Sequence, residues 1–202
     1  MRLIGVTKGV PVERIAHALS LGLVELGENR IQEARPKMAA LQGRGARWHL
    51  IGHLQRNKAK DAVELFDVIH SVDSWILAQD VDRRATQRNR VIDVLLQVNV
   101  SGEATKFGCA PDETAVLAQQ MIQLQHLRLV GLMTLTPFSD DPESARPHFR
   151  RLRQLRDHLA HSLGLESRVL SLSMGMSQDF EVAIEEGADL VRIGTAIFGA
   201  RS

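Results

Sequence analysis

The stretch RVLSLSMGMSQDFEVAIEEGADLVRIGTAIFG, residues 168–199, decides the fold class. An alternating apolar run at 168–174 is followed by a helical segment that begins near Gln178, and then by a β-branched run at 189–199. Two such strands joined by a helix form a parallel βαβ unit, because parallel pairing needs a long crossover connection. The stretch therefore predicts a sheet of parallel strands covered by helices.

The same alternation runs through the rest of the chain. Six further strands are predicted, at residues 3–8, 23–27, 48–52, 67–72, 91–100 and 127–135, and the longest connecting helix at 142–163. Eight strands in 202 residues favour a compact (β/α)8 barrel, a TIM barrel formed by one domain over residues 1–202. The alternative is an open doubly wound sheet, but no G-x-G-x-x-G follows the first strand and the chain has no glycine–lysine phosphate loop.

Composition narrows the class of protein. The 25 Lys+Arg and 24 Asp+Glu give a net charge of +1, which disfavours a general binder of nucleic acids or membrane surfaces. The single cysteine, Cys109, excludes an intrachain disulfide and indicates a reducing compartment, so we expect a cytoplasmic protein. No apolar run reaches the ~18 residues that a membrane span needs, and the first residues lack the apolar core of a signal peptide.

Lys8 stands at the end of the first predicted strand, the place where barrels carry their chemistry. It shares a strand face with two aliphatic residues, Ile4 and Val6, which is unusual for a lysine in a half-buried strand. One interpretation is a strand-end lysine whose amine reaches water. The other is a partly desolvated lysine with a lowered pKa, which forms a Schiff base with a carbonyl ligand.

The ends of the last two strands suggest a phosphate site. Barrels commonly bind phosphate on the loops after strands 7 and 8, through backbone amides and small residues. Here those loops supply Met176, Ser177, Gly194 and Thr195, although Ser177 can equally be a simple helix cap. Strand 1 lies beside strand 8 once the barrel closes, so Lys8 would lie across from this phosphate site. A phosphate-bearing aldehyde, bound to Lys8 as an imine, is the simplest ligand that fits both features.

Arg192 and Asn29 complete the site candidates. Arg192 shares a face with Gly194, so its guanidinium points into the barrel and needs an acceptor there. It is either a cation that faces the ligand or a partner in a structural ion pair with a carboxylate such as Glu28. Asn29, in the segment GENRIQEA, can hydrogen-bond a ring substituent or cap a helix.

Other polar residues give weaker indications. A basic cluster follows the third strand: His53, Arg56, Lys58 and Lys60. It is either a nucleic-acid contact or a solvated helix start, and we favour the second. The eight histidines show no H-E-x-x-H or comparable ligand pair, so no metal is predicted. Lys106, Met133 and Thr134 are candidates to line the mouth of the barrel.

Six segments together resemble the pyridoxal-phosphate homeostasis protein family, small barrels similar to the N-terminal domain of alanine racemase. The segments are VTKGVP, LGENRIQEA, WHLIGHLQRNK, VNVSGEATKFG, GLMTL and LSMGMSQDFEVAIEEGADLVRIGTAIFGAR. The resemblance implies that Lys8 holds pyridoxal 5'-phosphate as an aldimine, that Asn29 lies beside the pyridine ring, and that Arg192 faces the ring nitrogen. The residues that match the family's phosphate cradle are Ser177, Gly194 and Thr195.

The resemblance implies storage or delivery of the cofactor, in vitamin B6 homeostasis and in amino-acid and keto-acid balance. Arg192 is always protonated, so it would keep the ring nitrogen deprotonated and weaken the ring as an electron sink. We therefore assign no catalytic residue. The expected partners are pyridoxal phosphate and, as recipients, apo forms of pyridoxal-phosphate enzymes, with no membrane or nucleic acid. The chain is expected to be a monomer or a weak dimer.

Two enzymes remain as alternatives. An amino-acid racemase needs a second acid–base group, which alanine racemase takes from a tyrosine of a separate region, and this sequence contains no tyrosine. A Schiff-base aldolase acting on phosphosugars would share the lysine and the phosphate cradle. It would be colourless, whereas a cofactor carrier would be yellow.

The helix count predicts a gap in the barrel wall. Three residues follow the last predicted strand and no helix precedes the first, so seven helices would cover eight strands. The resemblance implies that the chain lacks the family's N-terminal helix. Val191, Ile193 and Ala196 are then expected to meet water, unless another chain or a shifted segment covers them.

Overall fold

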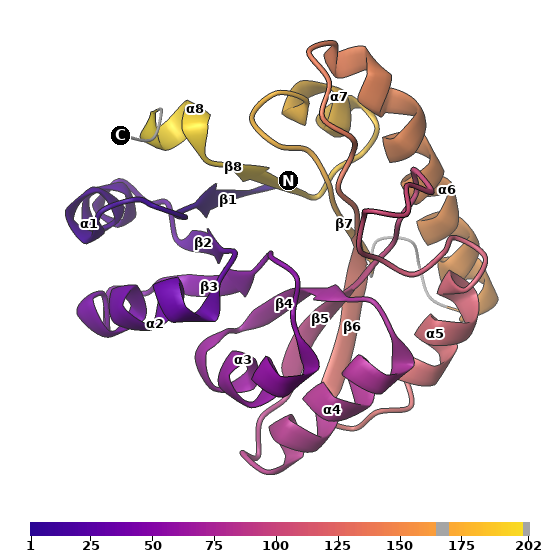
Figure 1. The fold of residues 1–202 in the computed structure, drawn as a ribbon, viewed down its shortest axis with the longest axis horizontal. Coiled ribbons are helices and arrows are strands. Elements are labelled where there is room, and N and C mark those ends of the chain that lie inside the picture. The colour runs from indigo at the N-terminus through magenta and orange to yellow at the C-terminus, as the bar shows by residue number, and fades with distance from the viewer. Residues whose placement is uncertain (165–169, 200–202) are drawn as a thin grey trace.

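Eight parallel strands close into a barrel in the computed structural model, which describes residues 1–164 and 170–199 (Figure 1). The strands are β1 (Arg2–Val6), β2 (Glu25–Glu28), β3 (Arg47–Leu50), β4 (Val68–Val72), β5 (Ile92–Gln97), β6 (Leu127–Met133), β7 (Ser171–Ser173) and β8 (Leu190–Ile193). They follow one another around the ring in chain order, and β8 pairs with β1, from Leu190 opposite Arg2 to Ile193 opposite Gly5. The predicted (β/α)8 barrel is confirmed, and the open sheet is wrong.

Helices connect the strands and surround the barrel (Figure 1). They are α1 (Val12–Ser20), α2 (Ile31–Ala40), α3 (Ala59–Leu65), α4 (Trp75–Thr86), α5 (Thr114–Met121), α6 (Arg146–Ser162), α7 (Phe180–Glu185) and α8 (Thr195–Phe198), with the short 3-10 helices η1 (Arg56–Lys58) and η2 (Pro142–Ala145). The long helix predicted at 142–163 is therefore η2 followed by α6. Its buried residues lie on one face, as the helical spacing predicted: Phe149, Leu152 and Leu159.

Apolar side chains pack on both faces of the barrel wall. Outward-facing residues such as Leu26, Ile69 and Leu172 join the helices in a large buried cluster. A second, smaller cluster fills part of the barrel interior: Ile4, Val68, Leu95, Met133 and Leu190. Because successive side chains of a strand point to opposite faces, the same strands serve both clusters. The interior is a packed core, so a ligand has to bind at one end of it.

The first strand is shorter than predicted. β1 ends at Val6, and Lys8 lies in a turn in which the Val10 amide donates to the Thr7 carbonyl at 2.9 Å. The Thr7 amide still bonds to the Gly27 carbonyl of β2, at 2.9 Å. Lys8 is therefore the first residue beyond the last link to the sheet, and its position is set by a turn rather than by the strand.

The last two strands are also shorter than predicted. β8 ends at Ile193, and its predicted extension to residue 199 is wrong because residues 195–198 form α8. The amides of Ile197 and Phe198 donate to the Gly194 carbonyl, which gives the chain a helical turn in place of a strand. β7 spans Ser171–Ser173, and residues 168 and 169 of the predicted strand lie outside the described residues.

The outer face of β8 is better covered than the helix count predicted. Val191 and Ile193 are buried, so the expectation that they meet water is wrong. The turn after β7 and helix α7 lie against Val191, and both residues join the cluster between the barrel and the helices. Ala196 is exposed, but on α8 rather than on a strand. Leu3 of β1 is 38% exposed, so the outer face of β1 is covered only in part.

Candidate functional site

A cavity of about 830 Å³ opens at the carboxyl ends of the strands. Loops and strand ends from seven of the eight strands contribute to it, which is the usual placement of a site in this fold. Its lining comprises Val6, Asn29, Ile51, Gly52, His53, Gln97, Phe107, Leu135, Phe138, Met176, Ser177, Gln178, Arg192, Gly194, Thr195 and Ala196. The cavity thus brings together six of the seven predicted site residues, all except Lys8.

Lys8 lies beside this cavity. It lines a small depression of about 60 Å³ that shares Val6, Gly194 and Thr195 with the main cavity. Its side chain is partly buried. Lys8 therefore borders the main cavity, and its position is compatible with the predicted role.

A buried ion pair fixes the backbone next to Lys8. Glu28 is fully buried, and its Oε1 accepts from Lys37 Nζ and from the Thr7 hydroxyl, each at 2.6 Å. Lys37 also donates to the Thr7 carbonyl at 2.6 Å. The peptide that precedes Lys8 is thereby held from two sides. Sequence analysis missed Lys37, which has no distinctive spacing, and considered Glu28 only as a partner of Arg192.

Arg192 is buried inside the barrel and is 3% exposed. Its Nη1 donates to Ser173 Oγ at 2.6 Å and its Nη2 to the Thr134 carbonyl at 2.8 Å. The proposed ion pair with Glu28 is therefore wrong, because these partners are neutral oxygens and Glu28 is paired with Lys37. Burial lowers the pKa of Arg192 to about 10, against the opposing effect of the Asp179 carboxylate, so the guanidinium stays protonated at neutral pH.

The loops after β7 and β8 meet at Ser177 and Gly194. The Gly194 amide donates to Ser177 Oγ at 3.3 Å, a long bond that ties the two loops together. A Cβ at position 194 would lie 3.3 Å from Val6 Cβ and 3.4 Å from the Val6 carbonyl oxygen, so glycine preserves the space between β8 and β1. Thr195 follows at the exposed start of α8. Ser177, Gly194 and Thr195 all line the main cavity.

Met176 contributes differently from the prediction. Its amide donates to Asp179 Oδ1 at 2.6 Å, and Asp179 Oδ2 accepts from the Thr136 hydroxyl at 2.8 Å. The amide that was expected to bind phosphate thus holds the loop after β7 to the loop after β6. Met176 lines the cavity and is partly exposed, so it supplies apolar surface to the rim.

Asn29 lines the cavity at the end of β2, which is separated from β8 by β1. A Cβ at Gly52 would lie 2.2 Å from the Asn29 carbonyl oxygen, so only glycine lets the loops after β2 and β3 approach so closely. Sequence analysis did not select Gly52, although a glycine directly after the strand segment WHLI was a usable signal. It also missed Gln97 and Phe138, because strand ends and long loops give no side-chain periodicity.

The other polar candidates divide between the cavity and its surroundings. His53 lines the cavity and its ring stacks on Phe107, with centroids 3.7 Å apart and 11° between the planes. Lys106 lines an adjoining pocket of about 260 Å³. Met133 and Thr134 are buried in the barrel and do not line the mouth, so that prediction is wrong for both. Within residues 1–164 and 170–199, no group of three or more His, Cys, Asp or Glu is arranged to hold a metal ion.

The chain matches the model of one protein family, described as "Alanine racemase, N-terminal domain", over residues 2–202. A pyridoxal phosphate homeostasis protein of Aquifex aeolicus is 46% identical over 200 residues, which cover 99% of this chain and 87% of that protein. A pyridoxal phosphate homeostasis protein of Pseudomonas aeruginosa is 44% identical over 199 residues, or 98% of this chain and 84% of that protein. The chain belongs to the alanine racemase N-terminal domain family and, within it, to the pyridoxal phosphate homeostasis proteins.

Solved structures agree with this placement. PipY of Synechococcus elongatus, solved without PLP, is 40% identical, with a TM-score of 0.93 over 98% of this chain and 93% of that chain. The same protein with PLP bound has a TM-score of 0.89 and 39% identity, over 98% of this chain and 92% of that chain. An alanine racemase of Clostridium difficile has a TM-score of 0.79 at 17% identity, over 99% of this chain and 52% of that chain, a likeness of fold alone.

Proposed function

We propose that this chain binds pyridoxal 5'-phosphate and holds it for intracellular vitamin B6 homeostasis, including amino-acid and keto-acid balance. One observation carries the proposal: a buried, protonated arginine lines the cavity and is bonded to two neutral oxygens. A cation desolvated in this way favours an electron-rich acceptor in the cavity. The relatives named above and the PLP-bound PipY structure support the identity of the ligand.

The residues at the mouth fit the parts of this cofactor. When bound, it supplies an aldehyde that reacts with amines and a pyridine ring that withdraws electrons. Lys8, beside the cavity, would hold the aldehyde carbon through its amine nitrogen. Ser177, Gly194 and Thr195 would bind the phosphate, and Asn29 would contact a ring substituent from the end of β2.

Arg192 would donate to the ring nitrogen and keep a proton off that atom. Because its pKa of about 10 leaves it charged at neutral pH, a second positive charge beside it is disfavoured. A ring that lacks this proton is a poor electron sink, which suits holding the cofactor better than carbanion chemistry on it. We therefore favour a carrier over an enzyme and assign no catalytic residue.

The racemase alternative is weaker. The sequence has no tyrosine to act as the second acid–base group, and the likeness to alanine racemase is one of fold. The aldolase alternative shares the lysine and the cradle, but it does not explain why a buried cation, Arg192, lines the cavity. It also predicts a protein that is colourless as isolated, whereas a cofactor carrier would be yellow as isolated.

Recipients and location follow from the same proposal. A carrier needs acceptors, and apo forms of pyridoxal-phosphate enzymes have the matching chemistry.

None of the helices in the described part of the chain is long and apolar enough to cross a membrane. Cys109 is buried, and burial raises the pKa of its thiol to about 11, so it is unreactive. A cytoplasmic location, and a monomer or weak dimer, remain predictions.

The test is to map the covalent linkage. The purified chain is incubated with pyridoxal 5'-phosphate, its absorption spectrum is recorded, and the complex is reduced with borohydride and digested. We expect a yellow protein and one labelled peptide, which contains Lys8. Lys8→Ala should lose the visible band and the label, whereas Lys106→Ala, which alters the adjoining pocket, should keep both. A label on Lys106 in the wild-type chain, or no uptake at all, would contradict the proposal.

A further inference from the structure

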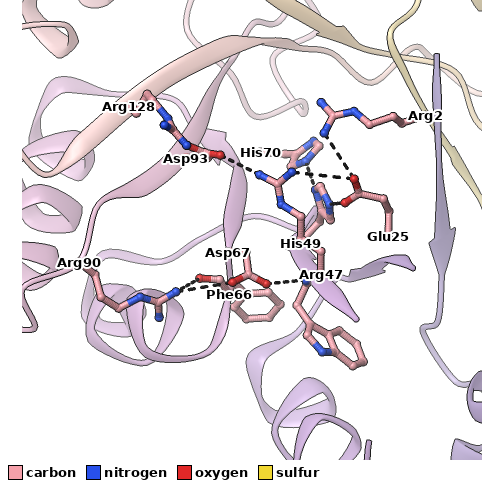
Figure 2. Close-up of polar contacts among 11 residues, drawn as sticks. Arg2, Glu25, Arg47, His49, Phe66, Asp67, His70, Arg90, Asp93 and Arg128 are labelled. Atoms are coloured by element: carbon pink, nitrogen blue, oxygen red, sulfur yellow. Dashed lines mark hydrogen bonds and ion pairs between the residues drawn. The ribbon is translucent and has the colours of Figure 1, made fainter. Parts of the chain in front are cut away.

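A chain of hydrogen bonds crosses the barrel interior, from Glu25 at the amino end of β2 to Arg192 at the cavity. Figure 2 shows its first two links: Glu25 Oε2 lies 2.5 Å from His49 Nε2, and His49 Nδ1 lies 2.8 Å from His70 Nε2. His70 Nδ1 then lies 3.0 Å from Ser173 Oγ. Ser173 Oγ is the atom that accepts from Arg192 Nη1, at 2.6 Å.

The two histidines of this hydrogen-bonded series, His49 and His70, are neutral at neutral pH. Burial lowers the pKa of His49, although its hydrogen bond to Glu25 works in the opposite direction. Burial, together with the nearby His49 and Arg192, holds the pKa of His70 well below its ordinary value of 6.5. The hydrogen bond from His49 lowers the pKa of Glu25, which is therefore ionised.

These charge states fix the place of every proton. A carboxylate only accepts, so His49 donates to Glu25 from Nε2 and carries no proton on Nδ1. His70 must then donate to His49 from its own Nε2, and its bare Nδ1 accepts from the Ser173 hydroxyl. Ser173 Oγ is left to accept from Arg192. All four bonds run in one direction, from the guanidinium to the carboxylate, and such a chain is mutually polarising.

Other charged side chains lie close to Glu25, at the amino end of the barrel strands (Figure 2). Glu25 Oε1 lies 3.4 Å from Arg2 Nη1 and 3.9 Å from Arg47 Nη1, which also favour its ionised form. Arg47 also pairs with Asp93 of β5 at 2.8 Å. Asp93 belongs to the same group of charges but has no bond to either histidine. It therefore offers a matched control for Glu25.

We propose that His49 and His70 are positioning residues. Because the Glu25 carboxylate fixes the tautomer of both rings, the Ser173 hydroxyl donates to His70 and its oxygen accepts from Arg192, which holds Arg192 in place at the cavity. The identity of the ligand that Arg192 contacts rests on the proposed function, whereas the direction of the four hydrogen bonds does not. Neither histidine lines the cavity, so neither touches the ligand.

The proposal has a physical consequence that a simple packing role lacks. If Glu25 lost its charge, an amide in its place could donate to His49 as well as accept from it. The two histidines could then exchange tautomers, and His70 could donate to Ser173 rather than accept from it. The Ser173 hydroxyl hydrogen would lose its acceptor, and the bond to Arg192 would weaken.

The first test uses Glu25→Gln and Asp93→Asn in the cofactor-free full chain. Each variant replaces a carboxylate by an amide at the same end of the barrel. Nitrogen NMR should show wild-type His49 and His70 as neutral rings with the proton on Nε2. Glu25→Gln should mix the tautomers of both rings and shift the Arg192 guanidinium signals, while Asp93→Asn should leave both unchanged. Unchanged tautomers in Glu25→Gln, or equal changes in both variants, would overturn the proposal.

The second test measures binding of pyridoxal 5'-phosphate by absorption. Weakening one buried hydrogen bond should lower the affinity about twofold to tenfold in Glu25→Gln and shift the pH titration of the visible band, with no change in Asp93→Asn. Altered tautomers with an unchanged affinity and titration would refute the link to Arg192. If the wild-type chain takes up no cofactor, the proposed function fails, and the NMR signals of Arg192 still decide the present inference.

If Glu25→Gln fails to fold, Ser173→Ala provides the same test at the Arg192 end of the hydrogen-bonded series. This change removes one hydroxyl from a buried position and adds no volume. We expect the same shift of the Arg192 signals and of the cofactor titration, with the bond between Glu25 and His49 intact. Wild-type behaviour of Arg192 in this variant would overturn the proposal.

Discussion

The two ends of the barrel use charge in opposite ways. At the amino end, charged side chains neutralise one another: Glu25 pairs with Arg2, and Asp93 pairs with Arg47 and Arg128 (Figure 2). At the carboxyl end, Arg192 is held by a hydroxyl and a carbonyl. The first arrangement satisfies its charges within the protein, and the second leaves a cation whose charge is unbalanced by its bonded partners.

The comparison shows why both ends are polar and only one is a candidate binding site. Partly exposed ion pairs gain little from each other, because water screens them. A desolvated cation beside a cavity interacts strongly with an anionic or electron-rich ligand, because the local dielectric is low. The burial of the arginines, and not the number of charges, separates the two ends: Arg47 and Arg128 are well exposed, whereas Arg192 is buried. Four predictions test this difference, from the largest expected effect to the smallest.

Lys37→Met should give the largest loss of stability. It leaves the fully buried Glu28 carboxylate without its cation, and breaking such a buried pair costs about 3 kcal/mol or more. For a chain of this size the loss corresponds to a fall in Tm of roughly 6–12 °C. Thermal unfolding measures it, and the double variant Lys37→Met with Glu28→Gln should recover part of the loss.

Arg35→Met is the control for that prediction. Arg35 lies on the same helix, α2, and pairs with Asp61 at 3.0 Å on the exposed side. Its loss should change the free energy of unfolding by less than about 1 kcal/mol. Equal losses for the two variants would mean that burial does not distinguish the Glu28 pair.

Arg192→Gln should have the largest effect on ligand binding. It removes the charge that the cavity presents while keeping a polar side chain next to Ser173 and the Thr134 carbonyl. A charge-assisted hydrogen bond is worth roughly 1.5–3 kcal/mol, so the affinity for pyridoxal 5'-phosphate should fall about tenfold or more. Equilibrium titration measures the affinity, and exchange of an amino acid's α-proton should become faster. An unchanged affinity and exchange rate would show that Arg192 is purely structural.

The buried histidines predict a loss of stability in mild acid. The pKa values of His49 and His70 are lowered on folding from the ordinary 6.5, so the unfolded chain binds more protons once the pH falls towards and below that value. Stability is then fully present above the unfolded pKa and declines as the pH falls from 7 to 5. Glu25 adds to the decline as the pH falls through its own lowered pKa.

Chemical denaturation at a series of pH values measures this slope. A variant with both histidines replaced, such as His49→Gln with His70→Gln, should be less stable at pH 7 and should lose less on acidification. The same slope in that variant and in the wild-type chain would assign the acid sensitivity to other groups.

Asp93→Asn should have the smallest effect. The Asp93 side chain is 9% exposed, but those of its two partners, Arg47 and Arg128, are 39% and 67% exposed, so water solvates both cations when the carboxylate loses its charge. We expect a loss of about 1 kcal/mol or less and a further decrease of that loss in high salt. Thermal unfolding at low and high salt measures both. A loss as large as that of Lys37→Met would remove the distinction between the two ends.

The fold was predictable because its signal is local and repeated. Alternating runs such as 127–135 and the helical spacing of Phe149, Leu152 and Leu159 depend only on which side of an element is buried. The elements' ends were less predictable. Residues 195–198 carry β-branched and apolar side chains typical of a strand, yet they form α8 beyond the end of the sheet, where no neighbouring strand offers its backbone.

The candidate site was predictable where its residues lie at the ends of strands that meet on closure. Arg192, Ser177 and Gly194 are of this kind, and the structure brings them to one cavity. Lys37 and His70 gave no such signal. Lys37 is one of several basic residues in its segment, and a histidine on a buried strand has no visible partner until other strands are placed beside it.

By itself, the sequence determined the alternation of strands and helices, the family, and the residues available for the site, because each depends on short segments of the chain. The tertiary structure decided which polar groups are paired. Only closure of the barrel places Ser173, 103 residues further along the chain, against His70. Docking of α2 on the end of β2 places Lys37 against Glu28, which is therefore not the partner of Arg192. Pairing depends on distances between strands, and these distances exist only once the ring is closed.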